Sequence, residues 1–315
     1  MNSEKEIVAE WRGDIDKPLL SICCIAYNHE KFIESAIRGF LIQKTSFPFE
    51  IYIHDDASTD TTAEIISSYA EKYPRIIKPI LQAENQYRNG NKPWIILNKY
   101  LLGKYVAVCE GDDYWVDPLK LQKQVTFLEE NLEYVISGHD ACIVTQDGKL
   151  IAKSKSSEMH KRDFEASELL YGKASLLTLS WVYRRGLVDD EAIAERSVVK
   201  NGDTFFLSLM GQHGKSHYHE DIKSAVYRRH AGGVWGMLEK SERKRANITT
   251  WLMISNYYKR IGREDVAENF WRHFKSSALS SYSIWELVKE LIIRTGQARK
   301  MRNALRRVGR LLTSE

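Results

Sequence analysis

Two groups of carboxylates each follow a short hydrophobic run, at residues 49–53 and 105–109. In chain order they are Asp55, Asp56 and Asp60, and then Glu110, Asp112 and Asp113. Clustered carboxylates repel one another unless a cation or hydrogen-bond donors neutralise them. The pattern therefore predicts a divalent metal that holds a diphosphate.

The second group forms an acid-x-acid triplet, Glu110-Gly111-Asp112, directly after its hydrophobic run. In open α/β sheets, ligands bind at the carboxyl ends of the strands, where this triplet would lie. One carboxylate of such a triplet can face a metal while its neighbour accepts a hydrogen bond from a sugar hydroxyl. Hard oxygen ligands suit Mg²⁺ or Mn²⁺. The alternative is an ordinary solvated acidic turn.

The residues that follow the hydrophobic runs at 19–26 and 49–53 could bind a nucleobase. Tyr27 follows the run at 19–26, and an aromatic ring in that place can stack on a base. Asp56 could accept from a nucleobase N–H or a ribose hydroxyl, whereas Asp60 is placed to cap the next helix. The competing interpretation of Tyr27 is an unremarkable loop tyrosine.

Two later positions could complete a transfer site. His230 precedes two glycines and could offer imidazole to the metal, while Arg228 or Arg229 neutralises phosphate charge. The alternative for this segment is a basic surface turn. Asp203 could cap its own helix, or it could be a general base that takes the proton of an acceptor hydroxyl.

The chain up to residue 131 alternates between strand-like and helical patterns. Strands are expected at 19–26, 49–53, 75–81 and 105–109, and helices at 30–43, 60–73, 94–102 and from 117. This alternation predicts an α/β fold with a mostly parallel sheet flanked by helices.

The pattern changes after residue 131. We expect strands at 134–144, 150–153 and 176–184, strand-like stretches within 215–229, and helices at 163–171 and 203–211. From residue 237 the chain is helical in pattern. The predicted organisation is a domain at 1–236 and a helical C-terminal extension at 237–315.

Composition limits the class of protein. The 315 residues are 43% hydrophobic and 28% charged with a net charge of +4, which fits a globular protein and gives no strong nucleic-acid signal. The four cysteines form no CxxC pair, so we expect reduced thiols and a cytoplasmic location. The N-terminus has no signal-peptide pattern, and no apolar run is long enough to span a bilayer.

Four ordered motifs across residues 17–236 resemble those of the family 2 glycosyltransferases, which have the Rossmann-like GT-A fold. They are residues 21–28 (SICCIAYN), 55–60 (DDASTD), 110–115 (EGDDYW) and 227–235 (YRRHAGGVW). Each motif is weak alone, and their order and spacing make the resemblance specific.

The resemblance implies roles for these residues. Tyr27 and Asp56 would hold the nucleobase, and Glu110 stands near the ribose, where the family usually has Asp. Asp112 would be the metal ligand, approached by His230, and the metal Mn²⁺ or Mg²⁺. The further donor contacts would be Asp55, Asp113 and Arg229, and the catalytic base would be Asp203.

The predicted activity is inverting transfer of a sugar from a nucleotide-sugar donor, a UDP-sugar, to a hydroxyl of a glycan or lipid-linked acceptor. Its setting would be bacterial surface polysaccharide biosynthesis. One alternative is a sugar nucleotidyltransferase, although the segment after the first strand lacks a glycine-rich basic loop. Another is a non-catalytic sugar- or nucleotide-binding module. An oxidoreductase is disfavoured because no GxGxxG follows a strand, and metal-dependent nucleotide binding would exclude a glycoside hydrolase.

The C-terminal segment is basic, with apolar residues at helical spacing between the charges. Its basic residues are Arg294, Arg299, Lys300, Arg302, Arg306, Arg307 and Arg310. This pattern predicts an amphipathic helix at 296–312, which either contacts an anionic membrane from the cytoplasmic side or packs on the protein.

Overall fold

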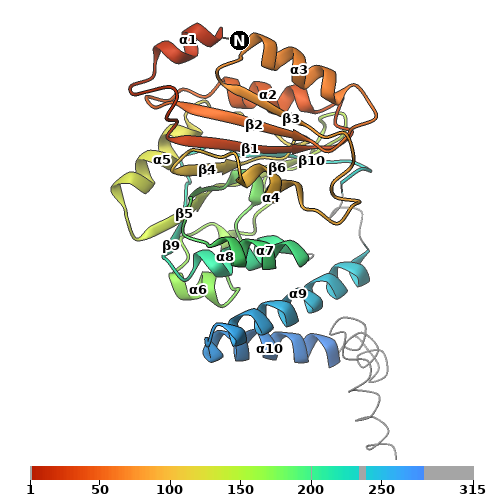
Figure 1. Ribbon diagram of the computed structural model, residues 1–315. Coiled ribbons are helices and arrows are strands. Elements are labelled where there is room, and N and C mark those ends of the chain that lie inside the picture. Colours follow the sequence, from red (N-terminus) through yellow and green to blue (C-terminus); the bar gives the residue numbers. More distant parts are fainter. Residues whose placement is uncertain (1, 200, 234–238, 280–315) are drawn as a thin grey trace, which may run out of the picture. The chain divides into compact units, whose positions relative to one another are not determined.

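The computed structural model describes residues 2–199, 201–233 and 239–279 (Figure 1). Contacts within the chain divide it into two compact units, Met1–Arg243 and Lys244–Glu315. The division falls between Arg243 and Lys244, and the boundary predicted at residue 236 stays a prediction. We describe each unit by itself.

The first unit is built on a mixed, mostly parallel sheet. Its strands are β1 (Leu20–Ala26), β2 (Phe49–Asp55), β3 (Ile77–Leu81), β4 (Tyr105–Val108), β5 (Tyr134–Gly138), β8 (Val182–Arg184) and β9 (Lys215–Tyr218). Their order in the sheet is β3-β2-β1-β4-β8-β5-β9. Only β8 runs antiparallel to its neighbours, so the predicted parallel core of the sheet is confirmed.

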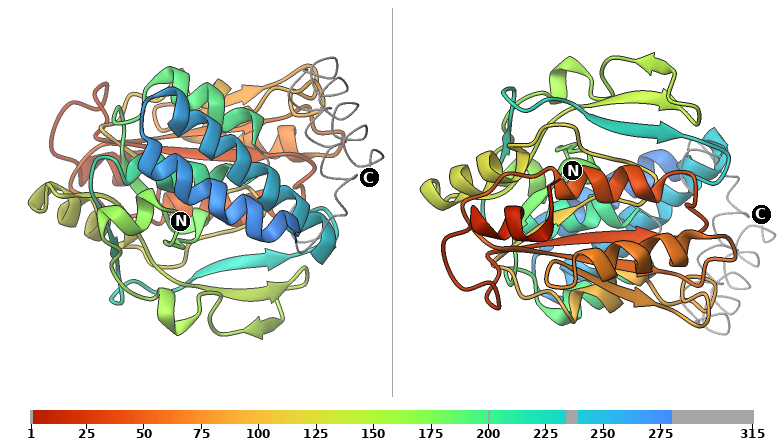
Figure 2. Two further views of the ribbon diagram at one scale, coloured as in Figure 1. Left: turned by 90° about the horizontal axis from the view of Figure 1, so that it is seen from below. Right: turned by 90° about the horizontal axis from the view of Figure 1, so that it is seen from above.

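Helices cover both faces of this sheet (Figures 1 and 2). They are α1 (Glu4–Ala9), α2 (Ile33–Leu41), α3 (Thr62–Lys72), α4 (Pro93–Asn98), α5 (Lys120–Glu130), α6 (Ala166–Leu170), α7 (Asp190–Val198) and α8 (Gly202–Met210), with 3-10 turns η1 (Glu158–His160) and η2 (Thr178–Ser180). Helices α2 and α3 lie on one face of β1 and β2, and α4 contacts the same strands from the other face.

The residues of β1 show why both faces are covered. Leu20, Ile22 and Cys24 belong to the core beneath α2, α3 and α5. Cys23, between them, packs with Leu97 of α4 on the opposite face. A strand buried on both sides needs a nearly continuous apolar run, which is what residues 20–26 supply. All four cysteines are free thiols, as predicted.

A second sheet contains β10 (Ala225–Arg229), β6 (Ala141–Thr145) and β7 (Leu150–Ala152), in the order β10-β6-β7. The single strand expected at 134–144 is thus two strands in different sheets. The chain breaks at Asp140, whose carboxylate accepts a hydrogen bond from the Ala141 amide. The strand expected at 176–184 is likewise η2 followed by the short β8, and the helix expected at 163–171 is only α6.

The second unit contains α10 (Glu264–Leu279) and most of α9 (Lys240–Arg260). Gly262, with φ +77°, forms the turn between these helices, and Ile248, Phe274 and Ala278 pack together. The predicted amphipathic helix at 296–312 lies outside the described residues.

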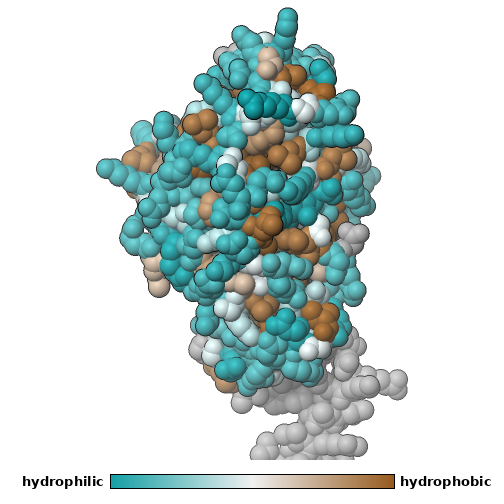
Figure 3. Space-filling view, turned by 90° about the vertical axis from the view of Figure 1, so that its left-hand side faces the viewer, coloured by the Kyte–Doolittle hydropathy of each residue, from teal (hydrophilic) through white to brown (hydrophobic). Residues whose placement is uncertain are grey.

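None of the helices described has a stretch long and apolar enough to cross a bilayer. The face seen in Figure 3 is mainly hydrophilic, and its hydrophobic side chains form separate patches.

Candidate functional site

The carboxyl ends of three parallel strands meet at one edge of the main sheet. β1 lies between β2 and β4, with Ala26 opposite Asp55 and Cys23 opposite Val108. Beyond the strands, the Asp56 amide donates to the Ala26 carbonyl, and the Gly111 amide donates to the Ile25 carbonyl, both at 2.9 Å. The loops that follow the three strands are therefore tied together, as the position of their polar residues predicts.

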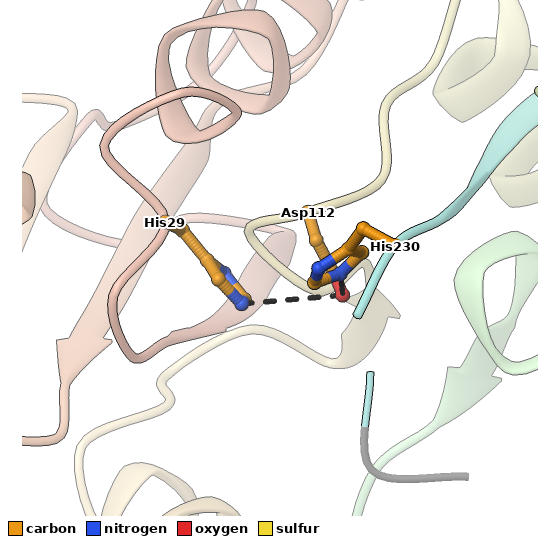
Figure 4. A group of neighbouring side chains, drawn as sticks. All are labelled: His29, Asp112 and His230. Carbon is orange, nitrogen blue, oxygen red and sulfur yellow. Dashed lines mark hydrogen bonds and ion pairs between the residues drawn. The ribbon is translucent and has the colours of Figure 1, made fainter. Parts of the chain in front are cut away.

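Asp112 lies between two imidazoles at this edge (Figure 4). Its Oδ2 is 2.9 Å from Nε2 of His230 and 3.9 Å from Nε2 of His29. Its other oxygen, Oδ1, is buried without a hydrogen-bond partner, and so is Nδ1 of His29. The Gly232 amide lies 3.2 Å from Nδ1 of His230, so this ring is held with its Nε2 facing Asp112.

Glu110, Asp112 and Asp113, which we call the acidic turn, have perturbed pKa values. Their oxygens lie within 4.8 Å of one another. Burial raises the pKa of Asp112, but the hydrogen bond from His230 and the nearby His29 outweigh it and lower that pKa overall. Burial and the charge of Asp112 raise the pKa of Asp113 well above its ordinary value.

Glu110 keeps an exposed surface, yet its pKa is also well above the ordinary value. Loss of solvation around its carboxyl is the largest cause, followed by the negative charges of Asp112, Asp113 and Asp203. A bound cation would remove the repulsion and return these groups to their charged forms. The unpartnered Asp112 oxygen and the two imidazoles are thus a donor set that fits a divalent metal.

His29 is the member of this group that sequence reasoning missed. It follows β1, two residues after Tyr27, and no ligand pattern in the sequence includes it. A Cβ atom at Gly111 would lie 3.0 Å from Nδ1 of His29 and 2.9 Å from the Ile33 side chain. The glycine between the two acids therefore leaves room for the His29 ring, a signal that only the packing reveals.

The loop after β2 uses its two adjacent acids differently. Both oxygens of Asp55 accept from Ser58, at 3.0 Å from its amide and 2.5 Å from its hydroxyl. Asp56 accepts from the amides of Gln86 and Tyr87, at 2.7 and 3.1 Å. Asp56 therefore anchors the loop after β3, while Asp55 closes its own turn.

Two further predicted residues of these loops have visible contacts. The Arg88 guanidinium lies 5.7 Å from the centre of the Tyr27 ring, above its face. Asp60 bonds to the amides of Thr62 and Glu30, so it joins the start of α3 to the loop after β1. The N-cap of α3 is Thr61, so the predicted cap at Asp60 is wrong by one residue, although the Asp60 carboxylate still accepts from the first amide of the helix.

The two arginines before His230, Arg228 and Arg229, differ in burial and in contacts. Arg228 is buried; its amide donates to Asp113 Oδ1 and its guanidinium to the Asp112 carbonyl, at 2.8 and 2.6 Å. These bonds hold the acidic turn against β10. Arg229 is exposed, so of the two it is the one whose charge is available to a ligand.

Asp203 lies in the first turn of α8, but Asn201 is the N-cap and accepts from the Thr204 amide. The Asp203 carboxylate instead accepts from the Thr178 hydroxyl at 2.6 Å, and Arg196 lies 3.5 Å from its other oxygen. Its side chain is 49% exposed. Its charge also raises the pKa of Glu110, so it lies within electrostatic reach of the acidic turn.

Buried groups hold the partners of Asp203. The Trp115 indole donates to the Leu179 carbonyl at 2.7 Å, which fixes η2 and hence Thr178. The Arg196 guanidinium lies 4.1 Å from the Trp94 ring centre, and its Nε donates to the Gly202 carbonyl at 3.0 Å. The carboxylate is therefore oriented from two sides while part of it stays open to solvent.

Comparison with known proteins agrees with this geometry. Residues 21–190 match the family described as glycosyl transferase family 2. An uncharacterized protein of Mycobacterium tuberculosis is 37% identical over 229 residues, 71% of this chain, and the match spans 63% of the relative's length. The putative teichuronic acid biosynthesis glycosyltransferase TuaG of Bacillus subtilis is 34% identical over 142 residues, 44% of this chain and 52% of TuaG.

Solved structures share the fold. Residues 1–349 of S. aureus TarS, in complex with UDP-GlcNAc, superpose with a TM-score of 0.59 at 19% identity. The superposition covers 81% of this chain and 72% of the TarS chain. The sheet and its flanking helices are thus those of the GT-A fold.

Proposed function

The chain belongs to glycosyl transferase family 2, and from that premise we propose that it is an inverting, metal-dependent glycosyltransferase. It moves a sugar from a nucleoside diphosphate to a hydroxyl of a glycan or lipid-linked acceptor. The observation that carries this proposal is the placement of Asp203, held by Thr178 and Arg196 yet open to solvent, within electrostatic reach of the acidic turn.

In this proposal the donor's nucleoside lies over the loops after β1 and β2. Tyr27 stacks on the base and Asp56 accepts from it, since each carboxylate oxygen has a second lone pair besides the one used by the loop amides. Glu110 accepts from the ribose. Asp55 supports the same loop through Ser58. TarS was solved with UDP-GlcNAc, which favours a UDP-sugar among the donors to be tested.

Asp112 and His230 would hold the metal, with His29 as a third ligand. Imidazole nitrogens suit transition metals better than Mg²⁺, so this donor set favours Mn²⁺. When bound, the metal supplies positive charge to the leaving diphosphate. Arg229 adds a second cation at the same edge, and Asp113 keeps the turn in place through the Arg228 amide.

Asp203 would take the proton of the acceptor hydroxyl as that oxygen attacks the anomeric carbon from the face opposite the diphosphate. Inversion of configuration follows from this geometry. The hydrogen bond from Thr178 and the charge of Arg196 orient the carboxylate so that a free lone pair faces the acceptor.

The acceptor is proposed to be a bacterial surface polysaccharide or its lipid-linked precursor. The name of TuaG supports this setting, because a relative at 34% identity is assigned to teichuronic acid biosynthesis. We place the reaction on the cytoplasmic side of the membrane, where nucleotide-activated sugars would meet a lipid-linked acceptor.

Release of nucleoside diphosphate tests the proposal. The protein is incubated with lipid-linked saccharide as acceptor and UDP-, GDP- or dTDP-sugars as donors, with Mn²⁺, Mg²⁺ or EDTA, and free nucleoside diphosphate is measured over time. We expect one donor class to be cleaved in the presence of Mn²⁺ and none in EDTA. Binding without cleavage, even with lipid-linked saccharide present, would instead indicate a non-catalytic module.

A further inference from the structure

Two cations without carboxylate partners lie beside the acidic turn. Lys155 follows β7, and Arg229 is the last residue of β10. Both side chains are exposed. Within the described part of the chain, no carboxylate oxygen comes within 4.0 Å of either cation.

The backbone that carries Lys155 is anchored. The Asp140 carboxylate, 7% exposed, accepts from the Ser154 hydroxyl at 2.5 Å and from the Ser156 amide at 3.0 Å. The Lys155 amide itself donates to the Ala141 carbonyl at 2.7 Å. The turn 154–156 is therefore fixed on both sides of the lysine.

The side chain of Lys155 is also located. Its ammonium lies 4.0 Å from the ring centre of Tyr227, which is in the middle of β10. An ammonium over an aromatic face is attracted by the ring's negative quadrupole. This contact holds the charge above β10, the strand that ends at Arg229 and directly precedes His230.

Alternate residues along β10 have different neighbours. Arg228 is 8% exposed and bonds to the acidic turn, whereas Tyr227 and Arg229 occupy the alternate positions of the strand. The cations are still in electrostatic reach of the site. The pKa of Lys155 is lowered overall, although the residue as a whole is exposed: loss of hydration around its ammonium is the largest cause, the charge of Asp113 opposes it, and the charge of Arg229 adds to it.

We propose that Lys155 and Arg229 form a subsite for a substrate oxyanion, a phosphoryl or carboxylate group. Two neighbouring cations without a carboxylate in ion-pair contact repel each other, and an oxyanion bound between them would replace that repulsion with two charge-assisted contacts. The inference rests on the proposed function, because the oxyanion comes either from the donor's diphosphate or from an acidic acceptor.

The test uses the full chain with Lys155→Gln, which removes the charge but keeps an aliphatic stem on Tyr227. Lys153→Gln, on the same exposed hairpin, is the matched control. Calorimetry measures the Kd of UDP, uridine, inorganic pyrophosphate and glycerol phosphate. Loss of one charge-assisted contact should weaken the oxyanion ligand about tenfold. Arg229→Gln should do the same, with a non-additive double variant because both cations bind one group.

The probes distinguish the two sources. Weaker UDP and pyrophosphate binding in Lys155→Gln, with uridine unchanged, would identify the donor's diphosphate. Weaker glycerol phosphate binding with UDP unchanged would identify an acidic acceptor.

The opposite results would overturn the subsite. Unchanged affinity for every anionic probe would do so, and so would an equal loss in Lys153→Gln, which would mean only a diffuse basic surface. If wild type binds pyrophosphate through Lys155 but no nucleotide, the subsite stands while the proposed function fails.

Discussion

At the scale of single residues, the Asp112 carboxylate lies next to two sets of titratable side chains. One contains His29 and His230, and the other contains Glu110 and Asp113. The imidazoles lower its pKa, while its own charge raises the pKa of both neighbouring acids. A cation bound at Asp112 would therefore affect every titratable group of the turn.

His29→Gln tests whether that residue contributes to the metal site. If His29 is a ligand, its loss should weaken Mn²⁺ binding about tenfold or more, since even partners of metal ligands are worth that much. Electron paramagnetic resonance of free Mn²⁺ measures the affinity directly. His213→Gln, at an exposed position, is the control. Equal Mn²⁺ affinity in both variants would remove His29 from the site.

Asp203→Asn tests the general base. Transfer should fall by roughly 10²–10⁴-fold, the usual contribution of a positioned base, while donor affinity is retained. The amide still accepts from Thr178, so the orientation of the side chain survives. Asp147→Asn, in an exposed turn, should leave transfer unchanged. Loss of donor binding in Asp203→Asn would show that the residue belongs to the donor pocket instead.

Part of the group proposed to hold the metal could be found from residue types, and part could not. Asp112 belongs to an acid-x-acid triplet and His230 to a His-Ala-Gly-Gly segment, and both patterns can be recognised in the sequence. His29 is in no such pattern. Its place beside Asp112 depends on how its ring packs against Gly111, which only the folded structure shows. Thr178 and Arg196 were also missed, since their contact with Asp203 depends on tertiary packing of η2 and α7.

At the scale of elements, the strands from β1 to β4 follow their hydrophobic runs closely. Three later segments, at 134–144, 163–171 and 176–184, do not. The sequence pattern at 134–144 is that of one continuous strand. In the structure, the Asp140 carboxylate accepts hydrogen bonds from Ala141 and from the turn at 154–156, and the strand is interrupted there. A periodicity argument has no access to such distant partners.

Helix α5 begins with a buried lysine that predicts a pH dependence of stability. Lys120 is 0% exposed, with its ammonium 2.6 Å from Gln124 Oε1 and 4.0 Å from the Trp115 ring centre. Burial lowers its pKa from 10.5 to about 7. Between those values the unfolded chain binds a proton that the native protein lacks, so this group adds stability as the pH rises.

Lys120→Met should remove this dependence. From pH 7.5 to 9.5, wild type should gain roughly 2 kcal/mol of unfolding free energy more than the variant, at about 1.4 kcal/mol per unit of pKa shift. Urea unfolding at both pH values measures the difference. The lost bond to Gln124 is independent of pH and cancels in that comparison. Parallel pH profiles for the two proteins would show that Lys120 stays protonated in the native state.

At the scale of the whole molecule, the family match at residues 21–190 lies within the first unit. The second unit, from Lys244, lies outside it, and so does the basic segment at the C-terminus. The sequence pattern of that segment, not its structure, is what predicts membrane contact.

Vesicle flotation tests this membrane contact. The full chain should float with vesicles that contain anionic lipid, and much less with zwitterionic vesicles or in high salt, because lysines and arginines near an anionic surface contribute about 1 kcal/mol each. A variant ending at residue 295 should remain at the bottom of the gradient. If truncation makes no difference, the segment has another role, and the proposed peripheral location loses its support.

The central claim is a metal-dependent donor site at Asp112. The most direct measurement is calorimetric titration of UDP, GDP and dTDP, each with and without Mn²⁺, into wild type, Asp112→Ala and the exposed control Asp147→Ala. We predict that one nucleotide binds wild type and the control in a Mn²⁺-dependent manner, and that Asp112→Ala loses this binding. Nucleotide binding that is equal with and without Mn²⁺, or unchanged in Asp112→Ala, would contradict the metal site.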